Sequence, residues 1–128
     1  MRLIAGTNNN CMIDAFAMAL NRLPSVIKSM LKHSGPYHYQ EFYPIIMEDG
    51  GIPSYYVIAP AVTELIYKNP IKAFKDFVGV SNAVVFGYTK HGIKHAVAYQ
   101  QGIFFDPLGS VSVVPPITLE ESVVIFRI

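Results

Sequence analysis

Three side chains in this sequence could together perform nucleophilic catalysis: Cys11, the only cysteine, His95 and Asp106. A thiol is a weak nucleophile until it loses its proton. An imidazole beside the thiol can take that proton, and a carboxylate behind the imidazole fixes the tautomer and orientation of the ring. These residue types therefore predict a thiolate nucleophile with a general base, provided that the fold brings them together.

Cys11 lies where a polar loop gives way to an apolar run, NNNCMIDAFAMAL (8–20). Asparagine is a preferred N-cap residue, so the sequence predicts a helix that begins next to Cys11 and ends at Asn21 or Arg22. The run is apolar on nearly every side, which predicts a buried, central helix. The positive end of the helix dipole would favour a thiolate at Cys11. Asp14 is expected to complement that dipole and to take no part in chemistry.

A two-residue turn at Gln101-Gly102 would join two predicted strands, HAVAYQ (95–100) and IFFDP (103–107). In the resulting register, His95 and Asp106 lie on the same face of the hairpin as diagonal neighbours. That spacing is within reach of a hydrogen bond between carboxylate and imidazole. A three-residue loop would put the two side chains on opposite faces, so this prediction depends on the turn.

The rest of the chain reads as mostly helical in its first half and mostly extended in its second. The further helices expected are 25–31 behind Pro24, 39–47, a segment from Ser54 toward Tyr67 that Pro60 kinks or splits, and 71–78. The further strands expected are 2–5, 82–89, 109–116 and 122–128. The fold class predicted is α+β, with a buried N-terminal nucleophile helix and further helices packed on a C-terminal antiparallel sheet. The 128 residues are expected to form one domain, 1–128.

Composition and charge exclude several classes of protein. The net charge is only +1 and the basic residues are scattered, so no nucleic-acid partner is expected. A single cysteine excludes an internal disulfide framework and a multi-cysteine zinc site. The N-terminal residues do not resemble a signal peptide, and the longest apolar run is far too short to span a bilayer. We therefore expect a cytoplasmic protein with no membrane span.

The chain is richer in apolar residues than an ordinary soluble domain. Apolar residues make up 52% and charged residues 15% of the sequence, and the mean hydropathy is +0.33. Charged residues normally contribute about 25%. The extra apolar surface would suit self-association, a partner site or a substrate groove, and composition does not choose among them.

Around Cys11, His95 and Asp106, the sequence resembles the papain-like cysteine peptidase superfamily, in a reduced form similar to the branch that cleaves double-glycine leader peptides. NNNCMIDAFAMAL is similar to the nucleophile helix, AVVFGYTKHGIKHAVAY to the strand and turn that lead into the catalytic histidine, and GIFFDPLG to the strand that carries the orienting aspartate. The chain order Cys, His, Asp agrees. The resemblance implies a protein or peptide substrate, a thioester intermediate, and no metal or cofactor.

One departure from the family pattern concerns the oxyanion hole. The family usually has a glutamine several residues before the cysteine, and none precedes Cys11 here. Asn8, or else Asn9 or Asn10, could supply the side-chain amide beside the backbone amide of Cys11. Asn8 is the preferred candidate because it lies furthest back in the loop. Loss of one such donor typically costs about 2.7–4 kcal/mol of transition-state stabilisation.

Other interpretations stay open at this point. Free cysteines are often simply buried, and an aspartate before proline is a common turn pair. The same triad could serve a transglutaminase-like acyltransferase, and a papain-like fold could serve as a non-catalytic binding module. A zinc site made of His91, His95 and Asp106 is disfavoured because a turn at Gly92 separates the two histidines. Substrate specificity is expected in three segments: GPYHYQEFY, GIPSYY and the YTKHG turn.

Overall fold

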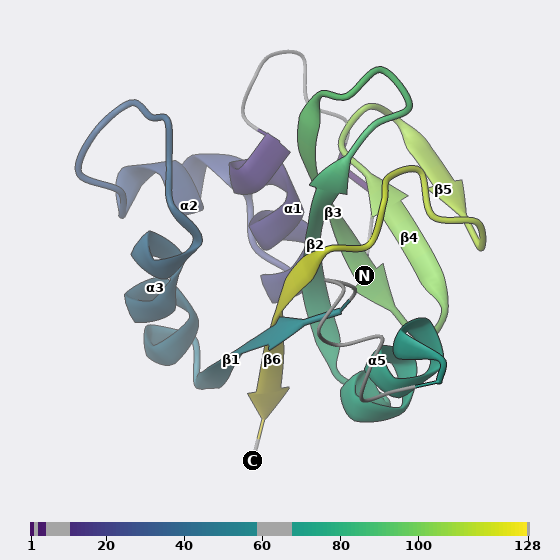
Figure 1. The fold of residues 1–128 in the computed structure, drawn as a ribbon. Coiled ribbons are helices and arrows are strands. Elements are labelled where there is room, and N and C mark those ends of the chain that lie inside the picture. The colour runs from purple at the N-terminus through teal and green to yellow at the C-terminus, as the bar shows by residue number, and fades with distance from the viewer. Residues whose placement is uncertain (2, 5–10, 59–67, 128) are drawn as a thin grey trace.

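The computed structural model describes residues 1, 3–4, 11–58 and 68–127 (Figure 1). The helices in these residues are α1 (Cys11–Leu20), α2 (Pro24–Ser29), the 3-10 helix η1 (Tyr39–Phe42), α3 (Tyr43–Glu48) and α5 (Pro70–Val78). The strands are β1 (Gly51–Val57), β2 (Asn82–Tyr88), β3 (Lys94–Gln100), β4 (Ile103–Asp106), β5 (Ser110–Ser112) and β6 (Glu121–Arg127). The predicted α+β content is therefore confirmed.

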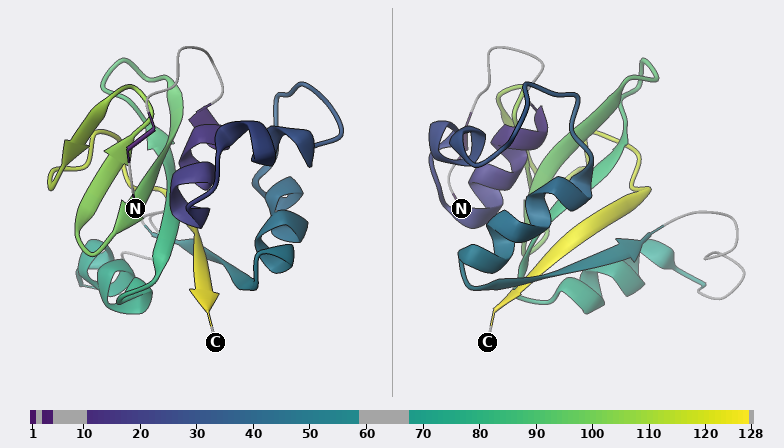
Figure 2. Two further views of the ribbon diagram at one scale, coloured as in Figure 1. Left: turned by 180° about the vertical axis from the view of Figure 1, so that it is seen from behind. Right: turned by 90° about the vertical axis from the view of Figure 1, so that its left-hand side faces the viewer.

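The strands form one antiparallel sheet of six, in the order β1-β6-β2-β3-β4-β5. Helices α1, α2 and α3 lie on one side of this sheet and α5 lies on the other (Figure 2). Along β2, Val84 and Phe86 pack in the cluster that contains α1, while Ala83 and Val85 pack in the cluster that contains α5. Because both faces are covered, the central strand is apolar at nearly every position instead of alternating.

Helix α1 is central, as its composition predicts. Every residue from Ile13 to Leu20 is buried, and the helix packs on β3 and β2. It ends at Leu20, and the next residue, Asn21, has a left-handed φ of 55°. The Asn82 side chain on β2 donates a 2.9 Å hydrogen bond to the Ala19 carbonyl. These contacts set the helix on the sheet with its first residue, Cys11, near the start of β3.

The hairpin between β3 and β4 has the predicted register. Ala98 pairs with Phe105, Tyr99 with Phe104 and Gln100 with Ile103. The two turn residues, Gln101 and Gly102, have φ values of 49° and 87°. Positive φ at both central positions is the mark of a type I′ turn, whose twist suits a two-residue hairpin.

The prediction of a helix from Ser54 toward Tyr67 is wrong for its first residues, 54–57, which form a strand. Gly51–Val57 is strand β1, which pairs along its whole length with β6. Tyr55 and Tyr56 favour a pleated strand, and Pro53 is tolerated because β1 is an edge strand. The rest of that expected helix, including Pro60, lies outside the described residues.

Two other expectations need correction. Within the expected strand 2–5, Leu3 and Ile4 belong to no strand, and positions 2 and 5 are outside the described residues. The expected strand 109–116 shortens to β5, at the edge of the sheet, where it pairs only with β4. None of the helices in the described ranges is long and apolar enough to cross a membrane.

Candidate active site

His95 and Asp106 are joined by a hydrogen bond, as the hairpin register predicts. Nε2 of His95 lies 2.6 Å from Oδ1 of Asp106, and the two residues are 7% and 5% exposed. The backbone amide of Leu108 donates a second hydrogen bond, 2.9 Å long, to the same carboxylate oxygen. The carboxylate is therefore held in place. It fixes the orientation of the imidazole ring and keeps a proton on Nε2, the nitrogen that faces Asp106.

Cys11 is the first residue of α1, and its thiol reaches the other side of the imidazole. Burial raises the pKa of the thiol, but hydrogen bonding with the His95 side chain and with the backbone of Ala96 and Met12 outweighs it. The net pKa therefore lies below its ordinary value of 9.0. Because Nε2 of His95 is bonded to Asp106, Nδ1 is the ring nitrogen left for the thiol.

The pKa of the His95 imidazole shifts in the opposite direction, upward. Hydrogen bonding with Cys11 raises the pKa of His95, burial lowers it, and the Asp106 carboxylate raises it further, to about 9. A thiol of lowered pKa beside an imidazole of raised pKa exchanges its proton readily. The arrangement favours a thiolate–imidazolium pair at a lower pH than that at which an isolated thiol ionises.

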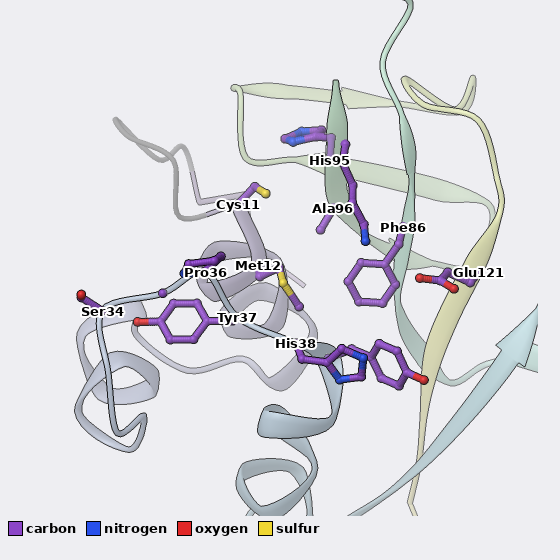
Figure 3. Close-up of a pocket in the computed structure, with 13 residues that line it drawn as sticks. Cys11, Met12, Ser34, Pro36, Tyr37, His38, Phe86, His95, Ala96 and Glu121 are labelled. Atoms are coloured by element: carbon purple, nitrogen blue, oxygen red, sulfur yellow. The ribbon is translucent and has the colours of Figure 1, made fainter. Parts of the chain in front are cut away.

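These side chains open into a pocket of about 510 Å³ (Figure 3). Cys11 and His95 lie at one end of the pocket, and Phe86 lies between Cys11 and Glu121. The pocket is lined by Cys11, Met12, Ser34, Gly35, Pro36, Tyr37, His38, Tyr39, Phe86, Lys94, His95, Ala96 and Glu121. The Cys11 thiol therefore borders a partly aromatic pocket, which is the kind of concave surface that binds small molecules and peptide side chains.

One wall of the pocket comes from the loop before η1. The Tyr37 hydroxyl donates a 2.6 Å hydrogen bond to the His33 carbonyl. His38 caps η1, because its Nδ1 accepts from the Gln40 amide at 3.2 Å while its own amide donates to Glu41 at 2.6 Å. Part of the predicted specificity segment GPYHYQEFY thus lines the pocket. The segments GIPSYY and YTKHG do not.

Sequence reasoning missed Phe86, Lys94 and Glu121 as pocket residues. Ala96 pairs with Phe86 across β3 and β2, and Phe86 pairs with Glu121 across β2 and β6. Directly paired residues share a face of the sheet. A correct pairing of β6 beside β2 would therefore have placed Glu121 next to Phe86.

The close approach of the Thr118 backbone to the end of β2 requires a glycine at position 87. Gly87 pairs with His95 in the β2–β3 register, and a Cβ added to Gly87 would lie 1.6 Å from the Thr118 carbonyl oxygen. The Thr118 amide donates to the Tyr88 carbonyl, and the Thr118 hydroxyl accepts from the Tyr88 amide, both at 2.9 Å. Only glycine allows the backbone around Thr118 to pass this closely, and that backbone leads directly into Glu121.

Asn8, Asn9 and Asn10, the candidates for the oxyanion hole, lie outside the described residues. Asp14 is 6% exposed, and burial raises the pKa of its carboxyl. Within the described ranges, no three or more histidine, cysteine, aspartate or glutamate side chains gather closely enough to hold a metal ion.

Comparison with known proteins adds no assignment, because no family model, no curated protein and no solved structure matches this chain significantly.

Proposed function

We propose that this protein is a papain-like cysteine peptidase or amidase that uses Cys11 as nucleophile, His95 as general base and acid, and Asp106 as the residue that orients His95. One observation carries the proposal. The thiol at the start of α1 hydrogen-bonds with an imidazole whose far nitrogen is bound to a buried carboxylate, and both Cys11 and His95 line a pocket. The papain-like motifs in the sequence agree with it.

The reaction follows from the positions of the protons. The Cys11 sulfur attacks the substrate carbonyl carbon, forming a C–S bond, and the carbonyl oxygen takes up negative charge. His95 then gives its proton to the leaving amine as the C–N bond breaks, which leaves a thioester on Cys11. A water molecule attacks the thioester while His95 accepts one of its protons. The C–S bond breaks, the acid is released, and the thiolate–imidazolium pair is restored.

Asp106 contributes through His95 and does not contact the substrate. Its Oδ1 accepts the hydrogen bond from Nε2–H and so keeps Nδ1 directed toward the thiol and the leaving group. Its negative charge also stabilises the imidazolium form. Asn8 remains the proposed side-chain donor to the oxyanion, beside the Cys11 amide.

The same thioester could pass its acyl group to an amine instead of water. Incubation of the protein with a peptide library, with and without an added primary amine such as putrescine, separates the two outcomes by mass spectrometry. Hydrolysis gives carboxylic acid products, whereas transfer gives new amides. The proposal of a peptidase predicts acids as the main product.

The test of the proposal is turnover of that library by wild type, Cys11→Ala and Cys11→Ser. Wild type should cleave peptides and Cys11→Ala should not, because it has no nucleophile. Cys11→Ser should lose nearly all activity, because an alcohol is far less acidic than a thiol. If wild type binds peptides but cleaves none, or if Cys11→Ala cleaves as well as wild type, the protein is not a cysteine peptidase. The first of these results would favour a binding module.

A further inference from the structure

The pocket also holds a carboxylate that the proposed reaction does not use. Glu121 is the first residue of β6 and lines the pocket. Figure 3 shows it beyond Phe86 when seen from Cys11. Its Oε2 accepts a 2.6 Å hydrogen bond from the Tyr55 hydroxyl. Burial and the Glu121 carboxylate raise the pKa of Tyr55, so the phenol stays protonated and keeps Glu121 in place.

No lysine, arginine or histidine in the described ranges forms an ion pair with Glu121. The carboxylate is flanked by aromatic rings. Tyr39 stacks on Tyr55 with ring centroids 4.9 Å apart, and Tyr39 lies 6.1 Å from the ring of Phe86. An anion beside aromatic faces is a favourable site for an organic cation with an apolar stem, because the rings hold the stem and the carboxylate holds the charge.

The sheet register sets the distance from this carboxylate to the nucleophile. Ala96, whose backbone hydrogen-bonds with the Cys11 thiol, is separated from Glu121 by Phe86 alone. Neighbouring strands lie about 4.8 Å apart, so the backbones of Ala96 and Glu121 are about 10 Å apart. A peptide advances about 3.3 Å per residue. A long side chain on the residue next to the scissile one would cover the remaining distance.

The position of His95 decides which half of the substrate lies over Phe86. The leaving amine must receive its proton from His95, so the leaving half lies at the His95 end of the pocket. The acyl half, which stays on Cys11 as the thioester, is then the half that extends toward Glu121.

We propose that the substrate carries a lysine or arginine on the acyl side of the scissile bond, one residue before the residue whose carbonyl is attacked, and that Glu121 binds its cation. This inference rests on the proposed function, because it places a substrate on the Cys11 thioester. Lys94 also lines the pocket and is exposed. It is on the strand of His95, two strands from Glu121 in the sheet order, and it forms no ion pair with Glu121. Its positive charge in the same pocket opposes binding of the cation.

The test uses three matched alkylating probes, acetyl-X-alanine chloromethyl ketones with X as lysine, norleucine or glutamate. The Cys11 thiolate displaces chloride, so a C–S bond forms as the C–Cl bond breaks. Wild type should react with the lysine probe about five- to tenfold faster than with the norleucine probe, which is the usual size of a hydrogen-bonded, partly solvated charge pair. The glutamate probe should be the slowest.

The variant Glu121→Gln keeps the shape and the Tyr55 contact but removes the charge. The lysine-to-norleucine rate ratio should fall close to one. The matched control is Glu120→Gln, the same change at the neighbouring residue, which does not line the pocket and should keep the wild-type ratio. Equal rates for the two probes in wild type, or a lysine preference that persists in Glu121→Gln, would overturn the inference. In Lys94→Gln the ratio should rise, because a second positive charge leaves the pocket, and a fall of the ratio to one would overturn the inference.

A binding experiment separates failure of this inference from failure of the proposed function. If no probe alkylates Cys11 faster than the thiol of the unfolded chain, the proposed chemistry is wrong. The Cys11→Ala variant can still be titrated by NMR with acetyl-lysyl-alaninamide and acetyl-norleucyl-alaninamide. Tighter binding of the lysine peptide, lost in Cys11→Ala/Glu121→Gln, supports a cation site at Glu121. Equal affinities overturn it.

Discussion

Nε2 of His95 lies 2.6 Å from Oδ1 of Asp106, with both residues nearly inaccessible to solvent. The carboxylate has two effects on the imidazole. It fixes the orientation of the ring, and, together with the larger contribution of Cys11, it raises the pKa of His95 to about 9. The two effects can be separated by mutation, because asparagine keeps an acceptor for the Nε2 proton but carries no charge.

Asp106→Ala should reduce kcat/KM by about 10- to 100-fold, which is the cost of losing a buried hydrogen bond to a charged group. Asp106→Asn should cost less, because its Oδ1 can still accept from His95 and from the Leu108 amide. The distinguishing readout is the pH profile. The alkaline limb should shift to lower pH in Asp106→Asn, since the imidazolium loses the carboxylate charge. If the limb stays in place and both variants lose activity equally, Asp106 is only a structural residue.

The pH profile of wild type is the second prediction. The pKa of the Cys11 thiol is lowered and that of His95 is raised to about 9. Activity therefore needs a pH above the first, where the thiolate has formed, and below the second, where His95 still carries the proton for the leaving amine. Steady-state kcat/KM should give a bell whose alkaline limb falls near pH 9. The two limbs belong to the coupled pair and not to either residue alone. A profile that rises steadily through pH 10 would contradict it.

Gly87→Ala should disturb the fold and the site together. The new Cβ would lie 1.6 Å from the Thr118 carbonyl oxygen, and Gly87 pairs with His95. Backbone cannot yield as a flexible side chain does, so we expect a loss of at least about 2–3 kcal/mol in the free energy of unfolding. Urea denaturation measures it. The control is Gly92→Ala, where an added Cβ meets nothing within 4 Å although φ is +76°, and the expected cost is only about 1–2 kcal/mol. Equal losses in the two variants would show that the contact with Thr118 does not matter.

The parts of this molecule that sequence predicts well are encoded locally. The Gln101-Gly102 turn dictates the register that brings His95 to Asp106. The change from asparagines to an apolar run marks the start of α1 at Cys11. In both cases the determining residues are within a few positions of the feature that they determine.

The parts that sequence misses depend on distant pairing. Strand β1 pairs with β6, which lies far along the chain, so Ser54–Val57 carried no local sign strong enough to exclude a helix. Glu121 enters the pocket only because β6 pairs with β2. The local sequence around Glu121 therefore gives no indication that this carboxylate shares a pocket with Cys11, which lies more than a hundred residues earlier in the chain.

The central claim is that His95 activates Cys11, and the rate of Cys11 alkylation by iodoacetamide at pH 6 tests it most directly. The native protein should react faster than the same chain unfolded in guanidinium, because only the native thiol has a lowered pKa. His95→Ala, checked for folding by circular dichroism, should remove that advantage. If native wild type reacts no faster than the unfolded chain, or if His95→Ala reacts as fast as wild type, His95 does not activate Cys11 and the account is wrong.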